Sequence, residues 1–479
     1  MTKLEGLKPQ RVFKYFEEIS AVPRGSENME GIADYCMDFA RKHSLKAVRD
    51  SANNVIIYKN AAKGYENSET VILQGHLDIV CQKENGREID FLTDGLDIYA
   101  EGDFVKANGT TLGADNGIAV AMILAILESD EILHPAIEAV FTTDEEIGML
   151  GAASLDMTKL SGKKLINLDA EEDDTLTVSC AGGSDFKIVV PKSCETAIGT
   201  EITVIFKGLK GGHSGVEINS GRVNANIIAG RFLNRIKQDV DFELISIDGG
   251  DKSNAIPNYC TVKLCAENAE KLIGAVEGYF TVVKEEIASR EPDFDFELLS
   301  GKQGEHTVLS KALKEKLIFF LVCAPNGVMD MSAEIEGLVE TSLNLGILKT
   351  EERNVIINFS LRSNKESALL FLEERVKAFS ACIPCSMEVS GHYPPWEFNE
   401  SSELQKLYKQ CFTEQFGFEP KVEAIHAGLE CGIFSSKIKG CDCIAIGPRL
   451  FDVHTVNERL SISSTQQIYK LLLKILEKS

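Results

Sequence analysis

Residues 70–78 read TVILQGHLD, in which an apolar run passes directly into a histidine and an aspartate. Thr70–Leu73 is typical of a buried strand that ends at Gln74 and Gly75. His76 and Asp78 are two residues apart, so in an extended chain they project to the same side. A carboxylate beside a metal-binding imidazole fixes the orientation of the ring. His-x-Asp pairs also arise by chance, so its meaning depends on the surrounding segments.

Later segments extend the strand pattern into an α/β layered fold. Two further strands and one apolar helix are expected at Ala136–Thr142, Lys164–Leu168 and Asn116–Glu128. This alternation predicts a mostly parallel central sheet with helices on both faces. Ligands in such folds gather at the carboxyl ends of the strands. His76, Glu145 and Asp169 each follow a predicted strand, which indicates one shared site.

Five short segments rich in histidine and acidic residues provide donors for two divalent cations. They are Gly75-His76-Leu77-Asp78, Gly113-Ala114-Asp115-Asn116-Gly117, Asp144-Glu145-Glu146, Asn167-Leu168-Asp169 and Asp452-Val453-His454. Two imidazoles and three carboxylates can hold two cations, and one further carboxylate remains to move protons. This inventory matches the nitrogen and oxygen ligands of a catalytic zinc site.

Asp115 and the acidic triplet after the second strand each allow two interpretations. Asp115 precedes an apolar helix and can be an ordinary N-cap, but flanking glycines permit close approach of the backbone and favour a carboxylate that bridges two metals. The triplet can be a solvated loop, although a cation would relieve its repulsion. Glu146 can then bind metal while Glu145 serves as a general base.

The remaining ligands come from two separate segments. Asp169 offers a ligand for the second metal, and Glu171 and Glu172 remain alternatives. His454 would complete the other side of the site. A lone histidine of this kind is more often structural, so the metal-ligand role of His454 is supported only by the other four ligand segments.

Composition narrows the class of protein. The chain has 479 residues, of which 44% are hydrophobic, which predicts two or three globular domains. The formal net charge is -23 without a long basic run, so nucleic acid and anionic membranes are not expected as partners. The apolar stretches Gly117–Leu127 and Leu317–Ala324 are shorter than the roughly 18 residues of a membrane span.

The N-terminus and the cysteines predict a cytoplasmic location. Residues 1–10 lack the apolar core of a secretory signal. Thirteen cysteines, an odd number, are typical of reduced thiols. Cys382-Ile-Pro-Cys385 allows a redox pair or half of a zinc site, but incidental cysteines are favoured because the sequence has no second pair of suitable spacing.

The middle of the chain has a different pattern of expected strands and helices, which predicts an inserted domain. Its expected strands are Glu201–Lys207, Tyr259–Cys265 and Val355–Leu361, and its expected helices are Arg222–Ile236, Asn268–Ile287 and Glu366–Phe379. Thr261–Ile273 aligns with Asn358–Leu370, which predicts two similar α+β halves. We therefore expect a catalytic domain split between residues 1–195 and 395–479, with an α+β lid domain at 196–394.

The ordered motifs Gly-His-Leu-Asp, Leu-Gly-Ala-Asp-Asn-Gly, Thr-Asp-Glu-Glu, Asn-Leu-Asp and Asp-x-His resemble those of the di-zinc exopeptidase and aminoacylase superfamily. Tyr393-Pro-Pro-Trp396, His426-Ala-Gly-Leu-Glu-Cys-Gly432 and Ile446-Gly-Pro448 are similar to its branch of aminoacyl-histidine, or cytosol non-specific, dipeptidases. The resemblance runs from about residue 8 to the C-terminus. It implies the metal ligands His76, Asp115, Glu146, Asp169 and His454.

The resemblance also implies a role for each of these residues. Asp115 would bridge the two zinc ions, His76 and Asp169 would serve one, and Glu146 and His454 the other. Asp78 would orient His76, and Glu145 would be the general base.

Four further residues are expected to act on the substrate. The segment Lys210-Gly-Gly-His213-Ser-Gly resembles one whose histidine donates to the oxyanion, against the alternative of an ordinary glycine-rich turn. Asn254 resembles a substrate-binding amide. Arg362 stands where the second half-repeat would present it to the substrate carboxylate, since Tyr259–Glu267 contains no arginine. Glu430 is expected either to meet the free amine or to support the site.

These observations predict a cytoplasmic dipeptidase with two zinc ions, or manganese or cobalt in their place. Its substrates would be small unblocked dipeptides, including Xaa-His such as β-alanyl-histidine. An N-acyl-amino-acid amidohydrolase with the same two metals is the nearest alternative, and a non-catalytic metal- or peptide-binding protein is a more distant one. A doubled lid permits a monomer, and a homodimer remains open.

Overall fold

The computed structural model describes residues 3–479 and divides the chain into two compact units. The first unit comprises residues 3–180, 398–424 and 429–479, and the second comprises 181–397 and 425–428. The second unit begins earlier than the predicted residue 196 because β9 (Gly182–Pro191) pairs with two of its strands. No helix among the described residues has both the length and the apolarity needed to cross a membrane.

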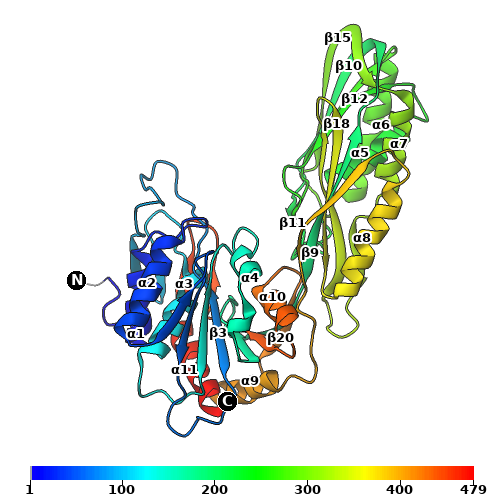
Figure 1. Cartoon of the computed structure of the whole chain (residues 1–479). Coiled ribbons are helices and arrows are strands. Elements are labelled where there is room, and N and C mark those ends of the chain that lie inside the picture. Colours follow the sequence, from blue (N-terminus) through cyan, green and yellow to red (C-terminus); the bar gives the residue numbers. More distant parts are fainter. Residues whose placement is uncertain (1–2) are drawn as a thin grey trace. The chain divides into compact units, whose positions relative to one another are not determined.

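The first unit carries the predicted metal ligands (Figure 1). Its elements are α1 (Gln10–Ser20), α2 (Glu30–Lys42), β1 (Lys46–Arg49), β2 (Val55–Lys59), β3 (Val71–His76), β4 (Ile98–Glu101), β5 (Phe104–Ala107), α3 (Ala114–Glu128), β6 (Ile137–Thr142), α4 (Leu150–Ser154), a short 3-10 turn η1 (Met157–Lys159), β7 (Lys164–Asn167), β8 (Thr175–Cys180), α9 (Glu403–Phe416), β20 (Lys421–Ile425), α10 (Glu430–Lys437), β21 (Asp442–Ala445), β22 (Leu450–Phe451), β23 (Arg459–Ser461) and α11 (Ile462–Lys478). The predicted strands and the predicted apolar helix of this unit are confirmed as β3, β6, β7 and α3.

An eight-stranded sheet forms the centre of this unit, in the order β1-β2-β6-β3-β7-β21-β8-β20. The four strands β6, β3, β7 and β21 are parallel, whereas β1, β2 and β8 pair antiparallel. The predicted parallel sheet is therefore confirmed for the central strands, and the whole sheet is mixed. Every residue of β3 and β6 is buried, as expected for strands covered on both faces.

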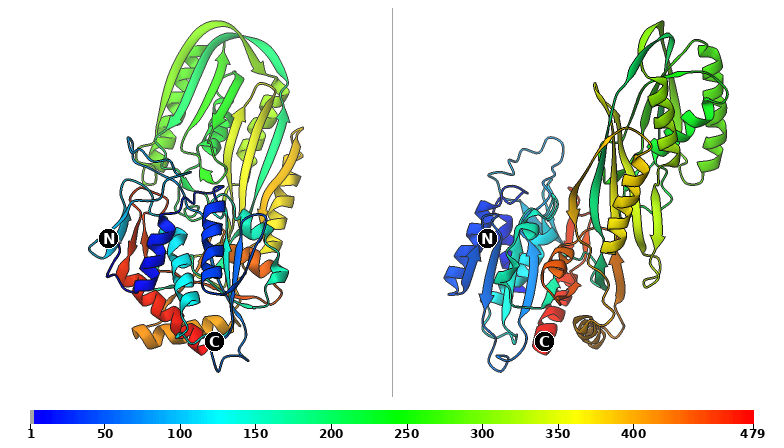
Figure 2. Two further views of the ribbon diagram at one scale, coloured as in Figure 1. Left: turned by 60° about the vertical axis from the view of Figure 1, so that its left-hand side comes forward. Right: turned by 45° about the vertical axis from the view of Figure 1, so that its right-hand side comes forward.

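Helices cover both faces of this sheet, as predicted. Helices α1 and α3 pack on one face, and α4 and α10 lie on the other (Figures 1 and 2). Helix α3 is apolar around its whole circumference, so it is buried rather than amphipathic. It packs directly on β3 and thereby places Asp115, in its first turn, near the end of that strand.

A small four-stranded sheet, β22-β23-β5-β4, was not predicted from the sequence. Strands β22 and β23 form a hairpin in which Phe451 faces Arg459, and β23 pairs with β5. The connection of this hairpin carries His454. The sheet therefore anchors the last predicted ligand to residues 104–107, which lie far away in the sequence.

The second unit contains the predicted lid segments (Figure 1). Its elements are β9, β10 (Cys194–Lys207), β11 (Gly212–His213), α5 (Ala225–Ile236), β12 (Glu243–Gly249), β13 (Ala255–Ile256), β14 (Cys260–Ala266), α6 (Ala269–Ile287), β15 (Asp295–Leu309), α7 (Lys311–Cys323), β16 (Gly327–Met331), β17 (Val339–Thr350), β18 (Asn354–Ser363), α8 (Glu366–Ser380) and β19 (Ser386–Tyr393). The predicted strands and helices of this region are confirmed as β10, β14, β18, α5, α6 and α8.

One nine-stranded sheet runs through the second unit in the order β15-β10-β14-β12-β17-β18-β9-β19, with β16 beside β17. Its neighbouring strands pair antiparallel, and its helices lie on one face (Figure 1). Strands β12 and β17 meet through the single pair Gly249 and Leu348. The aligned segments Thr261–Ile273 and Asn358–Leu370 both run from a strand into a helix, β14 into α6 and β18 into α8.

Candidate metal centre

The carboxyl ends of three parallel strands bring the predicted ligands together. His76 is the last residue of β3, Glu145 and Glu146 follow β6, and Asp169 follows β7. Strand register places His76 opposite Thr142 at the end of β6, and Gln74 opposite Asn167 at the end of β7. The predicted site therefore lies at one edge of the parallel strands, where this fold class binds its ligands.

Two groups of possible metal ligands share Asp115. In the first group, the Nε2 atom of His76 lies 3.1 Å from Oδ1 of Asp115 and 3.5 Å from Oδ1 of Asp169. In the second, the Nε2 atom of His454 lies 3.0 Å from Oδ2 of Asp115 and 3.0 Å from Glu146. Each oxygen of Asp115 thus faces a different group, which is the arrangement of a bridging carboxylate.

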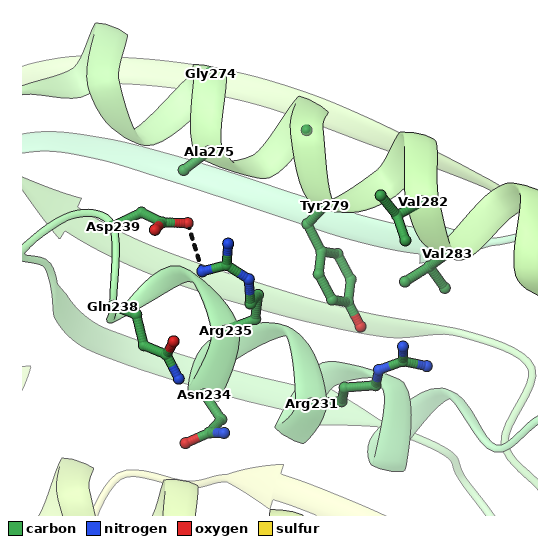
Figure 3. Close-up of a pocket in the computed structure, with 11 residues that line it drawn as sticks. Arg231, Asn234, Arg235, Gln238, Asp239, Gly274, Ala275, Tyr279, Val282 and Val283 are labelled. Atoms are coloured by element: carbon green, nitrogen blue, oxygen red, sulfur yellow. Dashed lines mark hydrogen bonds and ion pairs between the residues drawn. The ribbon is translucent and has the colours of Figure 1, made fainter.

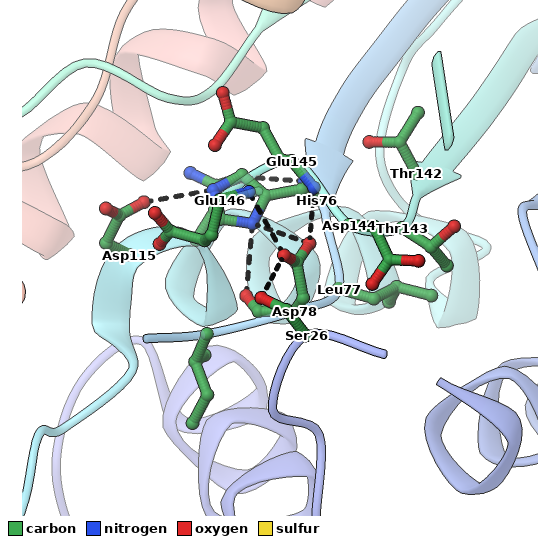
Figure 4. Close-up of polar contacts among 12 residues, drawn as sticks. Ser26, His76, Leu77, Asp78, Asp115, Thr142, Thr143, Asp144, Glu145 and Glu146 are labelled. Carbon is green, nitrogen blue, oxygen red and sulfur yellow. Dashed lines mark hydrogen bonds and ion pairs between the residues drawn. The ribbon is translucent and has the colours of Figure 1, made fainter. Parts of the chain in front are cut away.

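Asp78 supports this arrangement from beneath His76 (Figure 4). The Nδ1 atom of His76 lies 3.1 Å from the backbone oxygen of Asp78 and 3.4 Å from its carboxylate. The same carboxylate accepts hydrogen bonds from the backbone N–H groups of Glu145 and Glu146 and from the hydroxyl of Ser26. Asp78 therefore fixes the positions of both the imidazole and the loop after β6.

Glu145 and Glu146 point in different directions although they are adjacent. In Figure 4 the carboxylate of Glu146 lies beside Asp115, whereas that of Glu145 extends away from Asp78. Glu145 still has an oxygen near His76 and Glu146. Burial and the neighbouring carboxylates raise the pKa of Glu145. Glu145 is thus the site carboxylate that lies outside the two groups sharing Asp115.

The electrostatics of the site fit divalent cations. Hydrogen bonds to Asp115 and Glu146 raise the pKa of the His454 imidazole to about 11. Burial raises the pKa of Asp169 to about 6, although His76 opposes the shift. Five donors, two nitrogen and three oxygen, converge in two groups. Divalent cations would neutralise these carboxylates and replace the protons of the imidazoles.

The two alternative ligands from the sequence lie outside this arrangement. Glu172 belongs to a separate acidic group with Asp173 and Asp174, and Arg449 forms ion pairs with Glu172 and Asp173. Glu171 is in none of the ligand groups found among the described residues. Asp169 is the acidic residue of this segment that joins His76.

Glu430 is buried behind the strand ends and has 0% exposure. Its carboxylate accepts hydrogen bonds from the side-chain amide of Gln74 and from the hydroxyl of Thr142, the latter at 2.7 Å. Gln74 in turn accepts a hydrogen bond from Asn167 at 2.6 Å. These contacts link the ends of β3, β6 and β7. They favour the supporting role for Glu430 over contact with a substrate amine.

In the second unit, the structure brings together the segments of His213 and Asn254. His213 pairs with Ala255 across β11 and β13, and the N–H of Ser214 donates to the backbone oxygen of Asn254. The Nδ1 atom of His213 accepts from the backbone N–H groups of Gly215 and Val216. Burial lowers the pKa of His213, so its neutral ring carries the proton on Nε2. That N–H is a donor of the kind an oxyanion requires.

Arg362 also has unused hydrogen-bonding capacity. It is 7% exposed, and one guanidinium N–H donates to the hydroxyl of Tyr393 at 2.9 Å. Its Nε atom is buried without a hydrogen-bond partner among the described residues. A buried guanidinium with a free donor is suited to binding an anion.

His426 also belongs to the second unit, and its motif alone predicted no separate role for it. Its Nε2 atom is 2.7 Å from the hydroxyl of Ser342, and its Nδ1 atom is 3.1 Å from Oδ1 of Asn364. The amide oxygen can only accept, so Nδ1 carries the proton and Nε2 accepts from Ser342. Burial and the charge of Arg362 lower the pKa of His426 to about 3. The ring is therefore neutral.

A hollow of about 560 Å³ lies between α5 and α6 of the second unit (Figure 3). Arg235 forms an ion pair with Asp239 there, and Arg231 forms one with Glu286. None of the metal-ligand groups found among residues 3–479 includes a residue of this hollow. We therefore place the candidate active site at the strand ends of the first unit.

Sequence reasoning missed three residues that hold the site together. They are Arg24, Ser26 and Glu458, and they contact the ligand segments through backbone groups or through Asp78. The one available signal was the position of Glu458, which follows the motif of His454. Arg24 and Ser26 carry no spacing pattern that relates them to the ligands.

A mixed sheet flanked by helices, with possible metal-ligand groups at its strand ends, is an arrangement that suits a metal-dependent hydrolase. Residues 72–478 match the family model described as Peptidase family M20/M25/M40. The chain belongs to this family, so it is an enzyme that hydrolyses peptide bonds and uses divalent metal ions.

Two relatives are similar over almost their full length. The chain is 35% identical to the cytosol non-specific dipeptidase of Escherichia coli (strain K12), covering 100% of this chain and 99% of the relative. The crystal structure of aminoacylhistidine dipeptidase from Vibrio alginolyticus has a TM-score of 0.89 and 36% identity, with 99% and 98% of the two chains covered. An aminopeptidase from Bacillus cereus, with 15% identity, 98% and 99% coverage and a TM-score of 0.58, shares the fold.

Proposed function

We propose that this protein is a cytoplasmic dipeptidase that cleaves unblocked dipeptides, including Xaa-His such as β-alanyl-histidine, with two divalent metal ions. The observation that carries the proposal is that the two carboxylate oxygens of Asp115 face different ligand groups. One oxygen lies 3.1 Å from Nε2 of His76, and the other lies 3.0 Å from Nε2 of His454. The names of the two full-length relatives support dipeptides as the substrate class, and the name of the first supports the location.

In this proposal the ligands divide into two sets that share Asp115. His76 and Asp169 complete one set, and Glu146 and His454 complete the other. Asp78 orients His76 through the contact with Nδ1, which leaves Nε2 directed at the metal position. Zinc is the expected metal because the donors are nitrogen and oxygen, and manganese and cobalt are alternatives.

Glu145 is proposed as the general base. Bound divalent cations would supply Lewis acidity to the scissile carbonyl and lower the pKa of the attacking water. The carboxylate of Glu145 takes the proton from that water and returns it to the nitrogen of the leaving amine. This role is supported by its place beside His76 and Glu146, with which it forms a further possible ligand group that does not include Asp115.

Residues of the second unit are proposed to bind the substrate. The Nε2 proton of His213 would donate to the oxyanion that forms when water attacks the carbonyl. The guanidinium of Arg362 would grip the substrate carboxylate through two N–H groups, and the amide of Asn254 would contact the peptide. These assignments are supported by the Nε2 proton of His213, which follows from acceptance at Nδ1, and by the Nε of Arg362, which has no partner among residues 3–479.

The proposal is tested with metal-free protein titrated separately with Zn²⁺, Mn²⁺ and Co²⁺ while hydrolysis of β-alanyl-histidine is measured. We expect activity to rise until two equivalents are bound. A parallel panel compares unblocked dipeptides with N-acetyl amino acids. No hydrolysis with any metal would refute the dipeptidase, and a preference for N-acetyl amino acids would assign an amidohydrolase instead.

A further inference from the structure

Glu458 lies beneath the bridging aspartate as a buried carboxylate with an unusual set of donors. It is 3% exposed. One of its oxygens accepts from the backbone N–H groups of Leu112 and Gly113 at 2.8 and 2.9 Å. The other accepts from Ala114 and Asp115 at 2.8 and 3.3 Å. One carboxylate thus binds four consecutive backbone N–H groups, including that of Asp115 itself.

The chain segment of Glu458 also carries a ligand of the second group. Glu458 and His454 belong to the connection between β22 and β23, and the N–H of Glu458 donates to the oxygen of Thr455. An ion pair between Arg459 and Asp452 closes the same connection. Glu458 therefore ties the position of His454 to the backbone of Asp115.

Arg24 holds the other side of the same backbone segment. It is 2% exposed, and its two terminal nitrogens donate to the backbone oxygens of Leu77 and Gly113 at 2.9 and 2.6 Å. Leu77 lies between His76 and Asp78, so Arg24 links the first ligand group to the Asp115 segment. The opposite charges of Arg24 and Glu458 attract each other, which offsets part of the cost of burying both.

The segment between these two side chains is closely packed at Gly113, where no side chain would fit. Gly113 has a φ of +65°, and a Cβ atom there would lie 2.7 Å from Cγ2 of Ile79 and 3.0 Å from Nη2 of Arg24. The backbone just before Asp115 therefore requires glycine at position 113 and is held by the hydrogen bonds to Arg24 and Glu458.

We propose that Glu458 is a positioning residue of the metal centre: it holds residues 112–115 so that each oxygen of Asp115 faces its own ligand group. Arg24 holds the same segment from the side of His76, through its hydrogen bonds to the backbone oxygens of Leu77 and Gly113. This inference rests on the proposed two-metal function. Its consequence is that loss of the Glu458 carboxylate weakens both metal positions together, because both share Asp115.

The test compares Glu458→Gln with a matched control. Glu138→Gln removes another buried carboxylate of the first unit, one that accepts from the backbone N–H groups of Ser161 and Gly162 at the opposite end of β6. Metal-free proteins are titrated with Co²⁺, and binding is followed by visible absorption and by competition with a chelator. Urea unfolding of each metal-free protein measures the purely structural effect.

We expect Glu458→Gln to bind both equivalents of Co²⁺ about 10–100-fold more weakly, whereas Glu138→Gln binds like the wild type. Wild-type affinity in Glu458→Gln would overturn the inference even if its stability falls. If Glu458→Gln does not fold, Arg24→Lys is used instead, because a lysine cannot donate to both the Leu77 and the Gly113 carbonyl as the guanidinium does. Wild-type Co²⁺ affinity in Arg24→Lys would likewise overturn the inference. A wild-type protein without bound Co²⁺ would refute the two-metal function itself, and the inference with it.

Discussion

Acidification is expected to destabilise the second unit through His426. The ring is 5% exposed and neutral, with Nδ1 donating to Asn364 and Nε2 accepting from Ser342. A protonated ring would lose the bond from Ser342 and would carry a buried charge near Arg362. The neutral form is therefore the one that the fold stabilises.

The magnitude follows from the pKa of His426 in the folded and unfolded chain. It is about 3 in the fold and 6.5 ordinarily, so between these values the unfolded chain binds the proton and the folded chain does not. Stability from the neutral ring is thus complete above pH 6.5 and declines as the pH falls towards 3. Each pH unit in this window removes about 1.4 kcal/mol, which gives a loss of about 2 kcal/mol at pH 5.

Trp396 provides the assay, because it is the only tryptophan in the sequence, belongs to the second unit and is buried. Urea unfolding is followed by its fluorescence at pH 7.5 and pH 5.0. The control is His426→Gln, which keeps a donor and an acceptor but does not titrate. The wild type should lose about 2 kcal/mol more than this variant. Equal losses in the two proteins would refute the reasoning.

The remaining predictions concern the site. Glu145→Gln should retain its metals and lose about 10²–10⁴-fold in kcat, and near-normal kcat would remove Glu145 as the base. Asp115→Ala should lose both metals together by elemental analysis, unlike Glu172→Ala in the separate acidic group; a full metal content would contradict bridging. Arg362→Gln should raise KM roughly tenfold or more for dipeptides but not for dipeptide amides, reflecting a lost charged hydrogen bond; equal effects on both substrates would argue against carboxylate binding.

The sequence was sufficient for the elements that have a strong local pattern. Strands β3, β6 and β7 are short apolar runs, and α3 is apolar throughout, so their positions followed from periodicity and length. The ligand segments stand at the ends of these elements. The convergence of His76, Glu145 and Asp169 could therefore be expected from the geometry of parallel strands, whereas that of His454 could not.

Other features depend on contacts that no local pattern records. Glu458 meets the Asp115 segment across more than 340 residues of sequence, through backbone N–H groups that any residue could offer. The two-residue strand β22 is too short for a recognisable alternation. The second unit begins before the predicted boundary because β9 joins its sheet, and such pairing is invisible until its partners β18 and β19 are known.

The order of the ligands along the chain has a consequence for biosynthesis. The predicted ligands His76, Asp115, Glu146 and Asp169 are all synthesised before residue 170, whereas His454 follows 285 residues after Asp169 (454 − 169). At about 5–20 residues per second, this interval lasts roughly 14–57 s. If the proposed ligands are correct, the residues of the His76 group are therefore all synthesised before His454, which completes the other group.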